Sequence, residues 1–204
     1  TKVNLVDTPG YADFVGELRA GLRAADCALF VVAANEGVDE ATRQIWRECA
    51  QVQMPRAVVV TKLDHPRADY DGVLAQAQAA YGDKVLPLYL PIRDGADVSA
   101  LEGLLSGDLE SERRGQLIEG IIEESEDESL MDRYLGGEEI KEDVLVADLE
   151  KAVAHATFFP VMPVCSATGV GCTELLDLIV RGFPSPPEHT PPEVFTPAGA
   201  PAGT

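Results

Sequence analysis

Three short polar clusters, each following an apolar run, contain the residues best suited to chemistry on a phosphorylated ligand. The first cluster is Asp7-Thr8-Pro9-Gly10, which follows the β-rich run 2–6. The carboxylate of Asp7 can hold Mg²⁺ through a water, and Gly10 lets a backbone N–H approach a terminal phosphate. This cluster has low specificity alone, because Asp-x-x-Gly also forms ordinary turns.

The second cluster is Thr61-Lys62-Leu63-Asp64, which directly follows the apolar run Val58-Val59-Val60. A carboxylate in such a loop can accept hydrogen bonds from N1–H and N2–H₂ of guanine, and adenine offers no such pair of donors. The aliphatic stem of Lys62 can pack over the base while its ammonium group stays in a polar environment. An ordinary surface turn is the alternative for this tetrapeptide.

The third cluster is Ser166-Ala167-Thr168, where a backbone N–H can bind the guanine O6. The alternative makes Ser166 a turn residue or a helix cap. All three clusters follow an expected strand and precede an expected helix, and open parallel sheets bind ligands at the carboxyl ends of their strands. Together the clusters therefore predict a guanine-nucleotide site.

Two hydrophobic periodicities alternate in the elements that must position these clusters. Apolar residues at helical spacing predict helices, and short β-rich or continuous apolar runs predict strands. The expected helices span 12–25, 38–51, 69–81 and 172–181, and the expected strands span 2–6, 27–33, 56–61 and 158–165. The continuous apolar runs 27–33 and 56–61 indicate strands buried on both faces. This alternation predicts an α/β fold with a doubly wound, mostly parallel sheet.

An acidic stretch interrupts the alternation. Residues 91–107 are Gly-rich and we expect them to be irregular, followed by mostly acidic helices at 111–124, 127–135 and 142–156. The chain has a net charge of −19, and residues 101–150 carry seventeen Asp or Glu against four Lys or Arg. Such a surface repels a phosphate backbone, so it should not bind nucleic acid directly. It is either a solvated helical face or a docking face for a basic partner.

We therefore divide the chain into four parts. Residues 1–90 and 158–184 form the α/β domain, residues 91–157 form a helical insertion subdomain, and the Pro-rich residues 185–204 form a linker toward a following domain. The four cysteines form no Cys-x-x-Cys pair and the three histidines are scattered, which predicts reduced cytosolic thiols and no zinc site. No apolar run approaches the ~20 residues that a bilayer requires, and the start lacks the shape of a signal peptide, so we expect no membrane association.

Over nearly its whole length the chain resembles the GTP-binding domain of translational GTPases, most closely elongation factor G. Asp7 to Phe14 resembles that family's second switch, usually Asp-Thr-Pro-Gly-His-x-Asp-Phe, and Thr61 to Asp64 stands where the family has Asn-Lys-x-Asp. Further matching segments are Gly37-Val38 with Thr42 and Trp46-Arg47, Met54-Pro55-Arg56, Leu90-Pro91-Ile92, Asp132-Arg133-Tyr134-Leu135, Glu138-Glu139-Ile140, Phe159-Pro160-Val161 and Phe183-Pro184-Ser185-Pro186. The acidic insertion makes the match specific to this branch, because simpler GTPases lack it.

The resemblance implies a P-loop NTPase-type fold, GTP and GDP as ligands, and Mg²⁺ held by Asp7 through a water. It implies nucleotide contacts from Asp7, Thr8, Pro9, Gly10, Thr61, Lys62, Asp64, Ser166, Ala167 and Thr168. It further implies a cytoplasmic, monomeric factor that couples GTP hydrolysis to ribosome translocation or recycling, with the acidic insertion meeting the ribosomal stalk protein.

The sequence departs from the family at three points. No lysine is followed by Ser or Thr, so the phosphate-binding motif Gly-x-x-x-x-Gly-Lys-Ser/Thr is absent; in the family it lies upstream, with the first switch. We therefore expect a part of a larger protein, in which losing a central strand and helix leaves apolar sheet edges open. Tyr11 replaces the histidine that orients water, so we expect slower or altered hydrolysis, unless Tyr11 only packs and another group orients the water. Thr61 replaces asparagine, which weakens bracing between loops but leaves guanine preference to Asp64.

Two other functions remain open at this stage. One is a ribosomal-protection or regulatory GTPase that shares this domain. The other is a degenerate GTPase domain that acts as an interaction module.

Overall fold

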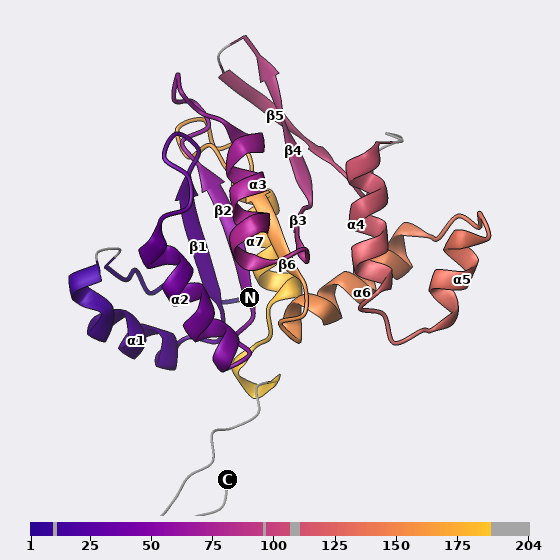
Figure 1. Cartoon of the computed structure of the whole chain (residues 1–204), viewed down its shortest axis with the longest axis horizontal. Helices are drawn as coiled ribbons and strands as arrows, with labels where there is room; N and C mark the ends of the chain where they lie inside the picture. Colours follow the sequence, from indigo (N-terminus) through magenta and orange to yellow (C-terminus); the bar gives the residue numbers. More distant parts are fainter. Residues whose placement is uncertain (10–11, 96, 107–110, 189–204) are drawn as a thin grey trace, which may run out of the picture.

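A parallel sheet forms the centre of the chain, in a computed structural model that describes residues 1–9, 12–95, 97–106 and 111–188. Its strands lie in the order β1 (Ala28–Ala33), β2 (Arg56–Thr61), β6 (Phe159–Pro163) and β3 (Val85–Pro87) (Figure 1). All three strand pairs are parallel, with Phe30 opposite Val58 and Val58 opposite Val161. The expected doubly wound parallel sheet is confirmed.

One face of the sheet is covered by α2 (Glu40–Gln51) and α3 (Tyr70–Tyr81), and α1 (Val15–Ala24) packs at its margin through Leu22. Side chains alternate along each strand, so Val58 and Val60 of β2 point to this face. The rings of Phe30, Trp46 and Tyr81 fill the space under α2 and α3, with Trp46 and Tyr81 stacked at 4.1 Å between centroids.

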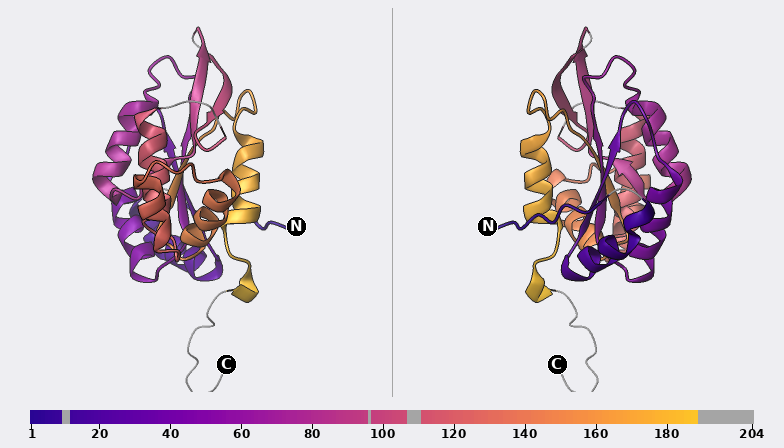
Figure 2. Two further views of the ribbon diagram at one scale, coloured as in Figure 1. Left: turned by 90° about the vertical axis from the view of Figure 1, so that its right-hand side faces the viewer. Right: turned by 90° about the vertical axis from the view of Figure 1, so that its left-hand side faces the viewer.

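The opposite face is covered by α6 (Glu142–Ala154) and α7 (Cys172–Gly182), and α4 (Glu112–Ile122) packs at the β3 edge of the sheet, with its apolar residues in the same core (Figure 1). Ala57 and Val59 of β2 point to this side, where they join a core that includes Leu117 of α4. Figure 2 shows the resulting three layers, with helices on both sides of the sheet. Helices α4 and α6 belong to the acidic insertion, so the insertion contributes directly to the core.

The expected helices are confirmed, with ends shifted by a few residues. The 12–25 prediction becomes a 3₁₀ turn at Ala12–Phe14 followed by α1, and the 127–135 prediction becomes α5 (Ser129–Leu135). Helices α2 and α3 begin after Asp39 and Asp69, whose carboxylates accept from the N–H groups of Thr42 and Gly72. These side chains cap groups that no residue inside the helix can satisfy. A last 3₁₀ turn spans Pro186–Glu188, and the remainder of the predicted linker, 189–204, lies outside the described residues.

The prediction of an irregular segment at 91–107 is wrong. Strands β4 (Tyr89–Asp94) and β5 (Asp97–Gly103) pair antiparallel as a hairpin that projects beyond the sheet (Figure 1). Pro91 and the glycines suggested a loop, but a two-stranded ribbon consists of edges alone, and edges tolerate proline. The pairing shifts register between Ile92 and Arg93. The three-residue strand β3 was not predicted either.

The expected strand at 2–6 is also wrong, because residues 1–9 adopt no regular structure. A strand requires a partner for its backbone hydrogen bonds, and the parallel sheet ends at β1 among the described residues. Strand β1 is confirmed at Ala28–Ala33 but is not buried on both faces, since Val31 is 64% exposed. The sequence predicted open apolar sheet edges, and β1 is a terminal strand of this sheet among the described residues.

Candidate functional site at the carboxyl edge of the sheet

The second and third polar clusters lie next to each other at the carboxyl edge of the sheet. They leave the adjacent strands β2 and β6, which pair in register from Val58 with Val161 to Val60 with Pro163. The pairing extends past the end of β6, because Val164 N–H donates to the carbonyl of Val60 at 2.8 Å. Thr61–Asp64 and Ser166–Thr168 therefore begin at the same level of the sheet.

The second cluster is anchored by Leu63, which is fully buried, while its neighbours Lys62 and Asp64 are exposed. Lys62 has a φ of 55°, a left-handed conformation, and its carbonyl accepts from His65 N–H at 3.1 Å. Asp64 forms no ion pair among the described residues, so its carboxylate oxygens can accept from a ligand. This arrangement presents one cation and one anion on a loop with a fixed anchor.

The third cluster is held by a tight turn around the buried Cys165. The carbonyl of Cys165 accepts from Gly169 N–H at 2.8 Å and from Thr168 N–H at 3.3 Å, and Cys165 N–H donates to Val170. Ser166, Ala167 and Thr168 are exposed on this turn. Within the described residues, neither Ser166 N–H nor Ala167 N–H donates to another backbone group, so both can serve a ligand.

Gly171 allows this turn to approach the end of β6 closely. Its φ is 84°, and a Cβ at this position would lie 2.3 Å from the carbonyl oxygen of Pro163 at the end of β6. Any side chain here would push the turn away from β6, so glycine is required for the close approach. Helix α7 begins at the next residue, Cys172.

The first cluster is not brought to this edge. Residues 1–9 run beside α1, well below the loops at the upper end of the strands (Figure 1). Thr8 packs against α1, since a Cβ on Gly21 would lie 2.8 Å from the Thr8 Cγ2 atom. Asp7 and Pro9 are exposed, and Gly10 and Tyr11 lie outside the described residues. The structure thus joins two of the three predicted clusters.

The sequence interpretation missed the loop after β1, which adjoins the second cluster. Glu36 Oε1 lies 3.2 Å from Lys62 Nζ, and Asp69 N–H donates to the carbonyl of Ala34 at 2.9 Å. Asn35 Oδ1 is buried and has no hydrogen-bond partner among the described residues. The signal was present, because this loop also follows a predicted strand and so had to reach the same edge.

Two of the cysteines lie away from this edge, Cys49 in α2 and Cys27 just before β1. Burial raises the pKa of both thiols to about 11, so neither is a ready thiolate at neutral pH. Over the described ranges, no three His, Cys, Asp or Glu side chains gather as a metal site. An exposed carboxylate such as Asp7 fits Mg²⁺, which binds one or two carboxylates together with phosphate oxygens and waters. Within the same ranges, every helix is too short or too polar to cross a membrane.

Comparison with known proteins shows the family to which the chain is similar. The family model described as "Elongation factor Tu GTP binding domain" matches residues 1–185. Two proteins called "Elongation factor G-like protein", from Mycobacterium tuberculosis strains CDC 1551 and H37Rv, are each 67% identical over 220 residues. The match covers 98% of this chain and 30% of either relative. A crystal structure of a protein from Thermus thermophilus matches with a TM-score of 0.76 and 34% identity, over 89% of this chain and 30% of that one. The chain thus spans under a third of the relatives that it matches.

Proposed function

The chain belongs to the translational GTPase family through its elongation factor Tu-type GTP-binding domain, and from this premise we propose that Asp64, Lys62, Ser166 and Ala167 hold the guanine base. The observation that carries the proposal is that two neighbouring loops offer complementary groups to a ligand, a hydrogen-bond acceptor on one loop and hydrogen-bond donors on the other. Asp64 supplies a carboxylate for N1–H and N2–H₂, and the turn after β6 supplies backbone N–H donors for O6. Thr61 and Thr168 flank these groups.

The phosphate side of the site falls to the first cluster in this proposal. Asp7 would hold Mg²⁺ through a water, with Thr8, Pro9 and Gly10 near the terminal phosphate, and Mg²⁺ would neutralise charge on the phosphates. Tyr11 stands at the position of the family's histidine. A phenol is a weaker base for handling water than imidazole at neutral pH, so Tyr11 supports slow or altered hydrolysis of GTP.

The chain matches 30% of the length of its relatives. In this proposal the whole protein would work in the cytoplasm as a monomeric factor on the ribosome. Its GTP hydrolysis would drive translocation or recycling. The acidic helices α4, α5 and α6 support docking of the ribosomal stalk protein, because they offer a negative surface to a basic partner. A ribosomal-protection or regulatory role would use the same domain.

The test of base recognition is a titration of fluorescent GDP into the full-length protein with Mg²⁺, in competition with unlabelled GDP or ADP. GDP should displace the probe and ADP should not. Asp64→Asn should weaken binding by roughly 10- to 100-fold, since a hydrogen-bonded charge contributes about 1.5–3 kcal/mol. Asp132→Asn, an exposed carboxylate on α5, removes the same charge and should leave the affinity unchanged.

A second titration result would favour the other candidate function. The 204 residues contain no Gly-x-x-x-x-Gly-Lys-Ser/Thr motif. If the full-length protein bound neither GDP nor GTP, the domain would serve as a nucleotide-free interaction module. Where binding is intact, Tyr11→His should raise GTP turnover on ribosomes, and unchanged turnover would refute a role for Tyr11.

A further inference from the structure

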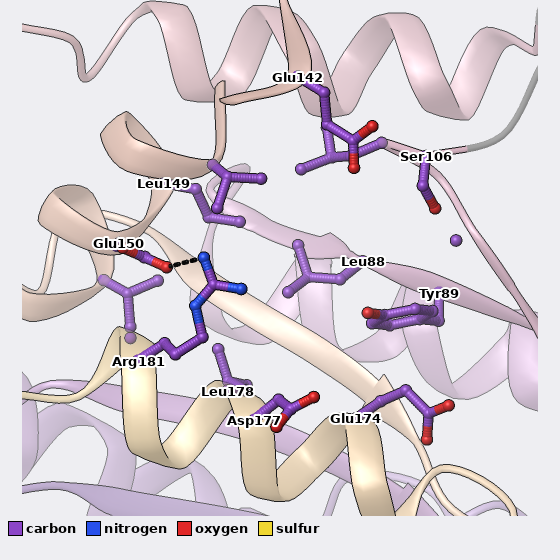
Figure 3. A pocket seen from close by; sticks show the side chains of 15 residues that line it. Leu88, Tyr89, Ser106, Glu142, Leu149, Glu150, Glu174, Asp177, Leu178 and Arg181 are labelled. Atoms are coloured by element: carbon purple, nitrogen blue, oxygen red, sulfur yellow. Dashed lines mark ion pairs between the residues drawn. The ribbon is translucent and has the colours of Figure 1, made fainter. Parts of the chain in front are cut away.

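A small cavity lies at the junction between the acidic insertion and the α/β domain. It has a volume of about 190 Å³ and is bordered by the start of β4, by α6 and by α7. Leu88, Leu149 and Leu178 point into it from three different segments, as Figure 3 shows. The floor of the cavity is therefore apolar and is made by the packing of α6 and α7 against the sheet.

The rim of this cavity is acidic. Glu142 comes from the first turn of α6, and Glu174 and Asp177 come from α7. Within the described part of the chain these three carboxylates form no ion pair. Tyr89 lies on the same rim, and burial, together with the carboxylates of Glu174, Asp177 and Glu142, raises the pKa of its phenol.

One arginine of this chain, Arg181, already lies at the side of the cavity, and its contacts illustrate how the walls can hold a basic side chain. The stem of Arg181 lies beside Leu178, and its guanidinium reaches Glu150 at 2.8 Å (Figure 3). Arg181 therefore balances one carboxylate of the rim, and three remain. Long basic side chains bury their methylene stems on apolar surface while the charged end stays with polar groups.

We propose that this cavity, which we call the junction pocket, receives one arginine side chain from a partner protein. Drug-sized ligands occupy pockets of about 300–1,000 Å³, so this smaller volume fits a single long side chain. The stem would lie on Leu88, Leu149 and Leu178, and the guanidinium would meet Glu142, Glu174 and Asp177 at the rim. Arginine is favoured over lysine because a planar guanidinium pairs with carboxylates in two directions and stacks on a ring such as Tyr89.

The junction pocket does not depend on the proposed guanine site, although helix α6 also belongs to the acidic surface proposed above for the stalk protein. Its walls are helices α6 and α7 and the start of the hairpin, and the two guanine loops contribute none of its lining. A partner bound here would contact the insertion and the α/β domain at once. Its binding should therefore be measurable without nucleotide, and a failure of GDP binding would leave the test intact.

The test is methyl NMR of the full-length protein, labelled at leucine and titrated with the peptide acetyl-Ala-Arg-Ala-amide. The same peptide with citrulline is the matched control, because citrulline has nearly the shape of arginine without its charge. The arginine peptide should give saturable shifts of the Leu149 and Leu178 methyl groups, and the citrulline peptide should bind at least 10-fold more weakly.

Two pairs of variants separate the pocket from general attraction to an acidic protein. Glu174→Gln with Asp177→Asn should weaken the arginine peptide at least 10-fold, whereas Asp132→Asn with Glu139→Gln removes equal charge elsewhere and should not. Leu178→Ala should weaken binding, and Leu176→Ala, which is on the same helix outside the pocket, should not. Equal loss in both charge pairs, or absence of saturable shifts, would overturn the proposal. Spermidine is a further control. If spermidine bound with the same affinity as the arginine peptide, and Leu178→Ala did not change that affinity, diffuse attraction of cations would explain the binding and the proposal would be overturned.

Discussion

At the scale of single residues, the least expected feature is a buried cation that has no acidic partner among the residues that the structure describes. Arg56 is 3% exposed at the start of β2, and its guanidinium carbon lies 4.5 Å from the ring centre of Trp46 and 4.2 Å from that of Phe159. Its Nη1 donates to the Met54 carbonyl at 2.8 Å, but its Nε has no partner among the described residues. Burial lowers the pKa of Arg56. Two aromatic faces thus replace the usual carboxylate.

The contacts of Arg56 predict that the stability of the fold depends on the planar shape of its guanidinium as well as on its charge. Arg56→Lys keeps the charge but loses the planar stack and should cost about 2 kcal/mol of unfolding free energy. Arg56→Met removes a desolvated charge at similar volume and should cost less, under about 1.5 kcal/mol. Urea unfolding at pH 7 measures both. If methionine costs more than lysine, charge rather than stacking stabilises the site.

The cap of α2 gives a prediction that depends on pH. Asp39 accepts from Thr42 N–H at 2.7 Å, and hydrogen bonds from the side chain and then from the N–H of Thr42 lower the pKa of its carboxyl group below the usual 3.8. A depressed pKa stabilises the fold above the unfolded value, and this contribution is lost as the pH falls through about 4 and then through the folded pKa.

Asp39→Ala should therefore cost about 1 kcal/mol at pH 7, and the difference should shrink below about pH 4. Asp39→Asn keeps an acceptor and should lose less at pH 7, without the same dependence on pH. Thermal unfolding from pH 3 to pH 7 tests this, with Asp83→Ala as an exposed control outside any cap. A cost of Asp39→Ala that stays constant down to pH 3 would contradict the role of the ionised cap.

At the scale of elements, the acidic insertion is structurally part of the domain that it interrupts. Leu117 of α4 is fully buried in the core that includes Ala57 and Val59 of β2. The charged face of the same helix looks outward, where Arg113 pairs with Asp71 of α3 at 2.8 Å. Exposed pairs of this kind contribute about 0–1 kcal/mol, so the apolar face holds the helix in place.

Removing that apolar contact should destabilise the whole domain. Leu117→Ala should cost about 2–5 kcal/mol, as expected for a fully buried leucine, and unfolding should remain a single transition. Leu135→Ala, on α5 with 73% of its side chain exposed, should change the unfolding free energy by less than about 0.5 kcal/mol. Circular dichroism during urea unfolding would measure both. Two separate transitions in Leu117→Ala would show that the insertion folds independently.

Much of the fold could be predicted because local patterns agreed with the tertiary structure. Helical spacing of apolar residues predicted a helix at 38–51, which α2 confirms, and the run Arg56–Thr61 became β2 without a change of boundary. The hairpin β4–β5 could not be predicted in the same way, because its strands carry proline and glycine and pair only with each other. Residues 2–6 failed for the opposite reason, since a β-rich run forms no strand without a neighbour.

The position of Asp64 and Ser166 at the carboxyl edge could be predicted because each follows an apolar run. The two lie next to each other because β2 and β6 are neighbours in the sheet. The sequence order alone did not reveal that β6 lies beside β2, since the whole insertion separates them. Glu36 was not predicted as part of the site, because its ion pair with Lys62 forms only when the loops after two different strands come together.

At the scale of the whole molecule, charge is the dominant property. The net charge of −19 is only partly balanced inside the structure, where Lys84 pairs with Glu123 and Glu124, and Arg181 with Glu150. Each of these pairs joins the insertion to the α/β domain. The unbalanced charge repels itself and favours expansion of the chain.

Salt should therefore stabilise the protein. Raising the salt concentration from about 0.01 M to 0.15 M shortens the Debye length from about 30 Å to 8 Å and screens this repulsion. The melting temperature should rise by roughly 2–4 °C, which corresponds to about 1 kcal/mol for a domain of this size. Sodium chloride and potassium chloride should act alike in scanning calorimetry. A fall in melting temperature would mean that the ion pairs outweigh the repulsion.

The strand order β1-β2-β6-β3 also governs the time at which this domain can fold during synthesis. Strand β6 inserts between β2 and β3, yet it is made last, after the entire insertion. Until residue 163 has been made, β3 has no neighbour in the sheet and the inner edge of β2 is open. Contacts so distant in sequence close slowly, and open apolar edges invite pairing with other chains. A nascent chain stalled within the insertion would therefore need a chaperone, whereas one released after β6 would not.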